Sequence, residues 1–194
     1  MKYDNGKIAG TLLFIGCVQC LMAMVIAASL YPGYSISENY ISDLGVGTTA
    51  LLFNSSVFLL GATMVAAAYY VQRAFGSKLL FILLTLTGIG AMGVGLFPEN
   101  FEVIHFVASL ITFLFGGLTT IMSYKLQKAP LSYFSVTLGA ISLAALVLFG
   151  SGTYLGLGKG GMERMIAYPA LLWGVGFSTS LMNHGKEKSA ATKP

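Results

Sequence analysis

Residues 8–30 read IAGTLLFIGCVQCLMAMVIAASL, an apolar run without a charged residue, and the polar stretch PGYSISENYISDLG follows at residues 32–45. About 20 consecutive apolar residues are enough for a helix to cross the hydrocarbon core of a bilayer. Five further runs of this kind occur at residues 49–71, 79–97, 103–124, 131–150 and 165–183. Because a helix satisfies its own backbone hydrogen bonds in lipid, the sequence predicts an all-α integral membrane bundle of six helices.

The composition supports this fold class. Hydrophobic residues make up 56% of the 194 residues and charged residues 9%, whereas roughly 25% charged residues is usual in soluble domains. The mean hydropathy is +0.79. A chain of this length leaves no room for a soluble module, so we expect a single transmembrane domain over residues 1–194.

The charged residues are distributed unequally between the two ends of the predicted bundle. Most of the 11 basic residues fall on one side, namely Lys2, Lys7, Arg73, Lys78, Lys125, Lys128, Lys186, Lys188 and Lys193. The other side carries Lys159 and Arg164 together with most of the 7 acidic residues. The positive-inside rule then predicts that the N- and C-termini are cytoplasmic. This topology accounts for the net charge of +4, so the charge does not indicate a nucleic-acid partner.

The polar stretch at residues 32–45 has helical spacing of its own. A short helix over Ser37–Leu44 would separate two faces. The apolar face would carry Ile36, Tyr40, Ile41 and Leu44, and the polar face Glu38, Asn39, Ser42 and Asp43. We expect such an amphipathic helix to lie flat at the outer membrane surface. The alternative is an ordinary solvated loop between two spans.

Polar residues gather where the predicted spans reach this outer side. Asp43 follows Asn39 by one helical turn and adjoins Ser42, and Asn54 lies near the start of the second span. His105 opens the fourth span, and Glu163 and Arg164 precede the sixth. Ionisable residues at the hydrocarbon boundary are costly and often mark function. We therefore expect them to meet in one polar pocket that opens outward.

Roles for these residues follow from their chemistry. Asp43, His105 and Glu163 are candidate catalytic residues, and Asn39, Ser42, Asn54 and Arg164 are candidate ligand-binding residues. A guanidinium is well suited to an anionic head group, so Arg164 is the candidate for that contact. Structural alternatives stay open, because Arg164 could form an interfacial ion pair and His105 could cap a neighbouring carbonyl.

Other kinds of site are weakly indicated. The spacing predicts no metal site, and no catalytic or nucleotide-binding motif indicates a cofactor. Cys17 and Cys20 form a CxxC pattern in the middle of the first span. A thiolate is disfavoured there, so we expect two small packing residues.

Several short motifs together resemble one family. They are NYISDLG at residues 39–45, Phe53-Asn54, GLFP at residues 95–98, His105, GMER at residues 161–164, and Trp173. This set resembles the six-span membrane proteins of domain-of-unknown-function family 998, over nearly the whole chain. The ISDLG element is also similar to one in the DRAM and Frag-type membrane proteins, whose members are linked to lipid handling. The resemblance implies a six-span fold and assigns no activity.

The sequence therefore predicts a multi-pass protein of the cell (plasma) membrane with an outward-facing pocket for a lipid or an amphipathic small molecule. Membrane lipid is the expected partner, nucleic acid is not, and homo-oligomerisation is possible. A membrane-embedded lipid head-group hydrolase or transferase, a small transporter and a structural subunit of a membrane complex remain alternatives, so the sequence leaves open whether the protein is an enzyme.

Overall fold

The fold was analysed in a computed structural model that describes residues 4–191, with side chains through Asn183. Six long helices account for most of it: α1 (Asn5–Leu30), α2 (Ala50–Phe75), α3 (Lys78–Leu96), α4 (Glu102–Met122), α5 (Leu131–Gly150) and α6 (Gly158–Ala191). Four short 3₁₀ turns lie between them: η1 (Ser42–Gly45), η2 (Gly47–Thr49), η3 (Glu99–Phe101) and η4 (Ser123–Leu126). Each long helix belongs to a segment that is long and apolar enough to span a membrane, so the predicted all-α bundle is confirmed.

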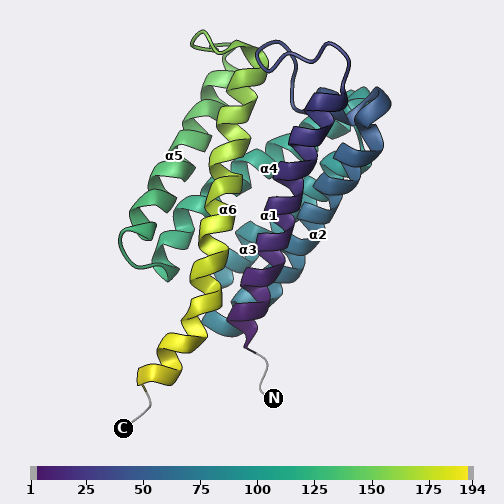
Figure 1. The fold of residues 1–194 in the computed structure, drawn as a ribbon. Helices are drawn as coiled ribbons and strands as arrows, with labels where there is room; N and C mark the ends of the chain where they lie inside the picture. Colours follow the sequence, from purple (N-terminus) through teal and green to yellow (C-terminus); the bar gives the residue numbers. More distant parts are fainter. Residues whose placement is uncertain (1–3, 192–194) are drawn as a thin grey trace.

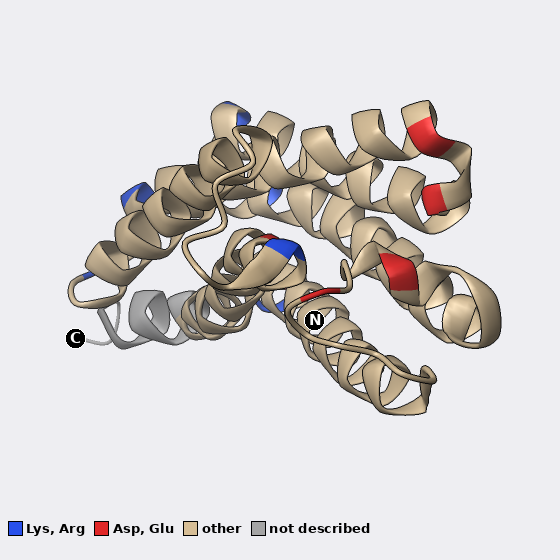
Figure 2. Cartoon of the chain, turned by 90° about the horizontal axis from the view of Figure 1, so that it is seen from above, with Lys and Arg blue, Asp and Glu red and all other residues tan. Residues whose placement is uncertain are grey.

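The six helices form a closed ring. Each helix packs against the next in the chain, α6 packs against α1 to complete the ring, and α4 also touches α6 (Figure 1). The start of α1 and the end of α6 lie at the same end of the bundle, opposite the long α1–α2 connection (Figure 1). Charged residues interrupt the apolar helices at only a few positions, most of them near helix ends (Figure 2).

Which end faces the cytoplasm stays a prediction. Four basic residues on which that prediction rests lie outside the described side chains: Lys2, Lys186, Lys188 and Lys193. We call the end that holds the α1–α2 connection the outer end.

Glycines bring neighbouring helices into close contact. A Cβ atom built on Gly88 of α3 would lie 2.7 Å from the carbonyl oxygen of Gly61 on α2. A Cβ on Gly139 of α5 would lie 2.8 Å from the carbonyl oxygen of Gly117 on α4. Association of helices in lipid depends on such close packing, because burial of apolar surface gives little driving force there.

The prediction of an amphipathic helix over Ser37–Leu44 is wrong. Residues 36–41 form turns and bends, and only the 3₁₀ turn η1 follows. The reason is that side chains take up the backbone donors: Asn39 Oδ1 accepts the N–H of Ser35 at 3.0 Å, and Asp43 Oδ2 accepts the N–H of Tyr40 at 3.0 Å. Asn and Asp commonly compete with helix formation in this way.

The apolar residues of this segment also separate. Ile41 and Leu44 are 4% and 1% exposed and belong to the core of the bundle, whereas Ile36 is 64% exposed. The segment is therefore neither a surface helix nor a freely solvated loop. It is a connection docked onto the outer end of the bundle, and we call residues 34–45 the docked loop.

The sixth helix begins at Gly158 rather than near residue 165, so Glu163 and Arg164 lie inside its first turns. Glycine usually weakens a helix, but here it makes room for the docked loop. The N–H of Gly160 donates to the carbonyl oxygen of Ser37 at 2.9 Å. A Cβ on Gly160 would lie 2.6 Å from the carbonyl oxygen of Ile36. Tertiary contact thus overrides the local propensity.

Candidate functional site

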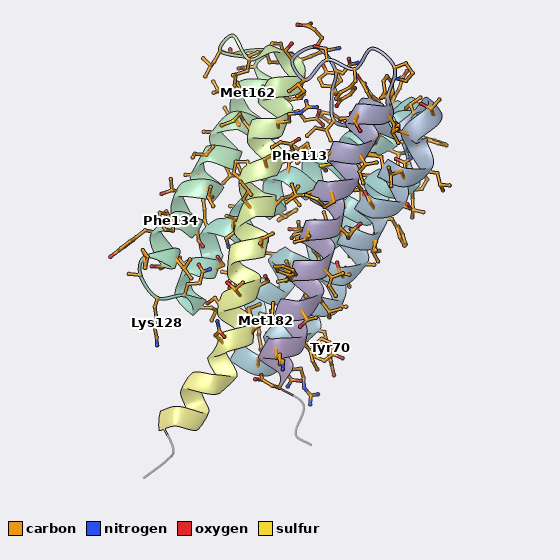
Figure 3. All side chains as sticks on the ribbon, in the orientation of Figure 1. Tyr70, Phe113, Lys128, Phe134, Met162 and Met182 are labelled. Carbon is orange, nitrogen blue, oxygen red and sulfur yellow. The ribbon has the colours of Figure 1, made fainter. Side chains whose placement is uncertain are left out.

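A cavity lies inside the ring of helices. Its volume is about 100 Å³, and its lining includes side chains from all six helices and from the docked loop. Most of the lining is apolar, including Leu60, Val94 and Ile166. Phe113 of α4, which also lines the cavity, is labelled near the middle of the bundle in Figure 3. The cavity is thus an interior feature of the six-helix ring.

The cavity is elongated along the helices. Its lining runs on α2 from Phe53 to Met64, on α4 from His105 to Gly116 and on α6 from Glu163 to Trp173. At a rise of 1.5 Å per residue, each of these stretches is about 15 Å long. That length is about half of the roughly 30 Å hydrocarbon core of a bilayer. All three helices run inward from the outer end, so the cavity reaches from the outer end to about the middle of the bundle.

Glu163 lies at the outer end of this cavity. The side chain is 6% exposed, and its Oε2 accepts the backbone N–H of Ile41 at 2.5 Å. This bond joins the first turns of α6 to the docked loop. Ile41 and its neighbour Ser42 also line the cavity, so the docked loop forms part of its outer wall.

His105 lines the same end and is 8% exposed. Its Nδ1 lies 2.8 Å from the carbonyl oxygen of Phe97, the residue that follows α3. A carbonyl only accepts, so Nδ1 is the donor in this contact, and Nε2 is an acceptor when the ring carries a single proton. The carbonyl contact considered as an alternative for His105 is therefore present, and the contact leaves Nε2 without a partner among the hydrogen bonds of the described residues.

Arg164 attaches the docked loop to α6. Its Nη1 donates to the carbonyl oxygens of Ile36 at 2.9 Å and of Asn39 at 3.3 Å, and to that of Gly160 in its own helix at 2.7 Å. The side chain is 8% exposed and is absent from the cavity lining. Its hydrogen bonds thus go to the protein backbone and fix the loop against α6.

Tyr34 completes this arrangement. Its hydroxyl accepts from Arg164 Nη2 at 2.6 Å and donates to the carbonyl oxygen of Tyr40 at 2.8 Å, and the guanidinium lies 5.5 Å from the centre of its ring. Burial raises the pKa of Tyr34, although the Arg164 charge opposes the shift. The phenol therefore stays protonated and can serve as donor and acceptor at once.

The remaining predicted residues shape the loop. Asp43 Oδ2 accepts from Asn39 Nδ2 at 2.8 Å, in addition to the N–H of Tyr40. Asn54 of α2 donates its Nδ2 to the carbonyl oxygen of Gly45 at 2.9 Å, while its buried Oδ1 has no hydrogen-bond partner. These residues are absent from the cavity lining.

The structure thus divides the seven predicted site residues into two groups. Ser42, His105 and Glu163 line the outer end of the cavity. Asn39, Asp43, Asn54 and Arg164 build or anchor the docked loop. Nothing in this division tests a catalytic or ligand-binding role, and those roles stay predictions.

Sequence reasoning missed the polar face of α4. Ser109 and Thr112 line the cavity below His105, and Gly116 ends the row. The four residues recur at intervals of three or four, so they share one helix face. That spacing could have indicated the face in advance. Cys17 and Cys20, expected only to pack, are buried free thiols that line the cavity as well.

Among the described side chains, residues 4–183, no group of three or more His, Cys, Asp or Glu residues could hold a metal ion. The ionisable groups that line the cavity apart from the cysteines are Glu163 and His105. The arrangement places a carboxyl group and an imidazole at one end of a mostly apolar cavity, with hydroxyl and thiol groups further along its wall.

Comparison with known proteins supports the six-span assignment. No curated protein and no solved structure matches the chain. Residues 14–180 match the family described as "Protein of unknown function (DUF998)". The match covers most of the chain and extends from α1 into α6. The chain, a multi-pass membrane protein, therefore belongs to the DUF998 family.

Proposed function

We propose that this protein binds a lipid or another amphipathic small molecule in the cavity of its helix ring. The apolar part of the ligand lies along the inner walls, and its head group lies beside Ser42, His105 and Glu163. One observation carries the proposal: the cavity is long and mostly apolar, and the carboxyl of Glu163 and the imidazole of His105 both lie at its outer end. An amphipathic molecule has the same division of polar and apolar parts.

The docked loop gives the ligand its way in. Ile41 and Ser42 form part of the outer wall of the cavity, and the loop is attached to α6 through Glu163 and Arg164. We assign Arg164 to holding this loop, because its guanidinium donates to three carbonyl oxygens and a phenol. Head-group recognition then falls to the residues that line the cavity.

We expect the protein to reside in the cell (plasma) membrane with the docked loop on the outer side. The basic residues of the sequence gather at the opposite end, which the positive-inside rule makes cytoplasmic. The ligand would then enter from the outer surface or the outer leaflet.

The test is to fill the cavity and to identify what co-purifies. Ala170 of α6 lines the cavity, so Ala170→Leu reduces its volume. Ala144 of α5 is exposed on the outside of the bundle, so Ala144→Leu adds the same atoms away from the cavity. Both variants and the wild type are purified in a mild detergent, and their bound lipids are measured by mass spectrometry. An amphiphile retained by the wild type and by Ala144→Leu, but lost from Ala170→Leu, supports the proposal.

Identical lipid profiles in all three proteins would contradict it. Incubation of the wild type with polar lipids of its host separates the enzyme alternative in the same experiment. A new lipid product that disappears in His105→Gln would support the hydrolase or transferase reading instead of simple binding.

A further inference from the structure

We infer that the ligand carries a cationic head group, an ammonium on a single apolar chain, and that the Glu163 carboxylate binds it. This inference rests on the proposed function and specifies the chemistry of its ligand. Among the residues that the structure describes, the cavity lining contains Glu163 and His105 but no Lys or Arg. An anionic head group would find no basic side chain in this wall.

The Glu163 carboxylate is only partly satisfied by the protein. Oε2 accepts the N–H of Ile41, and the described residues give no hydrogen bond to Oε1. The side chain is 94% shielded from solvent, since its exposure is 6%. Burial of a carboxylate costs desolvation free energy unless the group is paired and hydrogen-bonded. A cation beside Oε1 would therefore stabilise the buried carboxylate.

Neighbouring charges favour a cation as well. Asp43 and Glu99 lie close enough to Glu163 to interact with it electrostatically, and so does Arg164. The guanidinium of Arg164, however, is bonded to the loop carbonyls and to Tyr34. Lys159 interacts with Glu99, so three acids at this end face two basic residues, Lys159 and Arg164. The balance is still negative and attracts a positively charged head group.

Other groups at this end suit an ammonium. An ammonium donates three hydrogen bonds, and the same lining offers Ser42 Oγ as a further acceptor, together with His105 Nε2 when the ring carries a single proton. Phe53 also lines the cavity and belongs to its outer end, because a Cβ on Gly45 of η1 would lie 3.2 Å from its ring. The face of an aromatic ring attracts cations, most strongly where water is excluded.

The shape of the cavity selects the apolar part. The lining extends about 15 Å from Glu163 to Trp173 at 1.5 Å per residue, and the small volume admits one chain. Trp173 is the single tryptophan of the sequence, is 4% exposed and lines the inner end. It therefore reports on whether a chain reaches the bottom of the cavity.

The experiment uses quenching of Trp173 fluorescence by alkyl chains that carry bromine at the end remote from the head group. Three probes share one chain and differ in head group: a primary amine, an alcohol and a phosphate monoester. They are titrated into the purified full-length protein in lipid nanodiscs. The Ala170→Leu variant gives the quenching that arises from probe dissolved in the bilayer alone.

We expect the amine to quench at a concentration about tenfold lower than the alcohol, because its head group forms a charge-assisted hydrogen bond, and the phosphate to be the weakest probe. Glu163→Gln should abolish the difference between amine and alcohol and leave the alcohol curve unchanged. Its amide oxygen can still accept the Ile41 N–H, so the loop contact is kept. Glu102→Gln is the matched control, since Glu102 is an exposed acid at the same end; it should leave all three curves as in the wild type.

The outcomes separate this inference from the proposed function. Equal quenching by amine and alcohol, or stronger quenching by the phosphate, overturns the cationic head group while the cavity remains a binding site. Saturable quenching by none of the probes, with Ala170→Leu like the wild type, overturns both. The comparison of the three probes on the wild type does not depend on any variant and decides the matter even if Glu163→Gln folds poorly.

Discussion

Glu163 and Arg164 are consecutive residues that hold opposite kinds of backbone group from the same loop. The carboxylate of Glu163 accepts the N–H of Ile41, and the guanidinium of Arg164 donates to the carbonyl oxygens of Ile36 and Asn39. The partners are more than 100 residues apart in the chain, so the first connection of the protein is fixed by the start of its last helix.

Loss of the Arg164 guanidinium should release the docked loop. Arg164→Met keeps most of the apolar stem but removes every donor, which leaves buried carbonyls unsatisfied. Hydrogen bonds to charged groups are worth about 1.5–3 kcal/mol each, so we expect a loss of about 3 kcal/mol or more. A lower melting temperature in detergent and faster proteinase K cleavage within residues 34–45 would be the measured signs.

Lys159→Ala is the matched control for Arg164. Lys159 lies at the same end of α6 as Arg164, and its ammonium lies 4.4 Å from the centre of the Tyr40 ring. A cation–π contact of this kind is worth about 0.5–1 kcal/mol at exposed sites. A melting temperature and cleavage rate that change as much in Lys159→Ala as in Arg164→Met would mean that Arg164 has no special part in holding the loop.

Gly160→Ala should displace the same loop by steric overlap. Its Cβ would lie 2.6 Å from the carbonyl oxygen of Ile36 and would overlap that of Asn39. Gly176, in the same helix, has no atom within 4 Å of a Cβ position. Gly176→Ala should therefore be neutral or stabilising by about 0.5–1 kcal/mol, the usual gain of Ala over Gly in a helix. Thermal unfolding of the two variants side by side gives the comparison, and equal stability would contradict the close approach.

Gly88→Leu should disrupt the packing of α2 against α3. A Cβ at this position already lies 2.7 Å from the Gly61 carbonyl oxygen, and the larger side chain would push the helices apart. Overpacking typically costs about 1–3 kcal/mol and here acts on backbone that cannot rotate away. Gly150→Leu, where nothing lies within 4 Å, is the control. We expect the yield of monodisperse protein in size-exclusion chromatography to fall for Gly88→Leu alone.

The predicted topology can be tested by labelling single cysteines in intact cells. In a protein whose Cys17 and Cys20 are replaced by Ser, a cysteine is introduced at Ser151 or at Ala129. Ser151 is exposed at the outer end, and Ala129 is exposed in the α4–α5 connection at the other end. A membrane-impermeant maleimide should label Ser151→Cys but reach Ala129→Cys only after lysis. The reverse pattern would invert the orientation of the whole bundle.

The spans could be read from the sequence because the information is local. Each run of about 20 apolar residues must become a helix in lipid, whatever it packs against. The docked loop could not be read in this way. The helical spacing of Ile36, Ile41 and Leu44 indicated a helix. The backbone N–H of Ile41 and the carbonyl oxygen of Ile36, however, form hydrogen bonds with side chains of α6.

The cavity was only partly predictable for a different reason. The meeting of Ser42, His105 and Glu163 could be expected, since ionisable residues at span ends avoid lipid. The apolar depth below them could not, because the lipid-facing and cavity-facing sides of these helices are both apolar. Leu60 lines the cavity and Leu59 is 46% exposed, yet nothing in their chemistry distinguishes them.

The seam between α1 and α6 has a consequence for how the protein is made. The ribosome delivers the spans one after another, so the ring stays open until the last helix arrives beside the first. A Cβ on Gly10 of α1 would lie 2.7 Å from the Met182 side chain, so this final junction requires a close fit. Until it forms, Ile41 lacks its carboxylate acceptor and the wall of the cavity is incomplete. A nascent chain that stops before α6 would thus be inserted with an open ring and a docked loop that lacks its attachment.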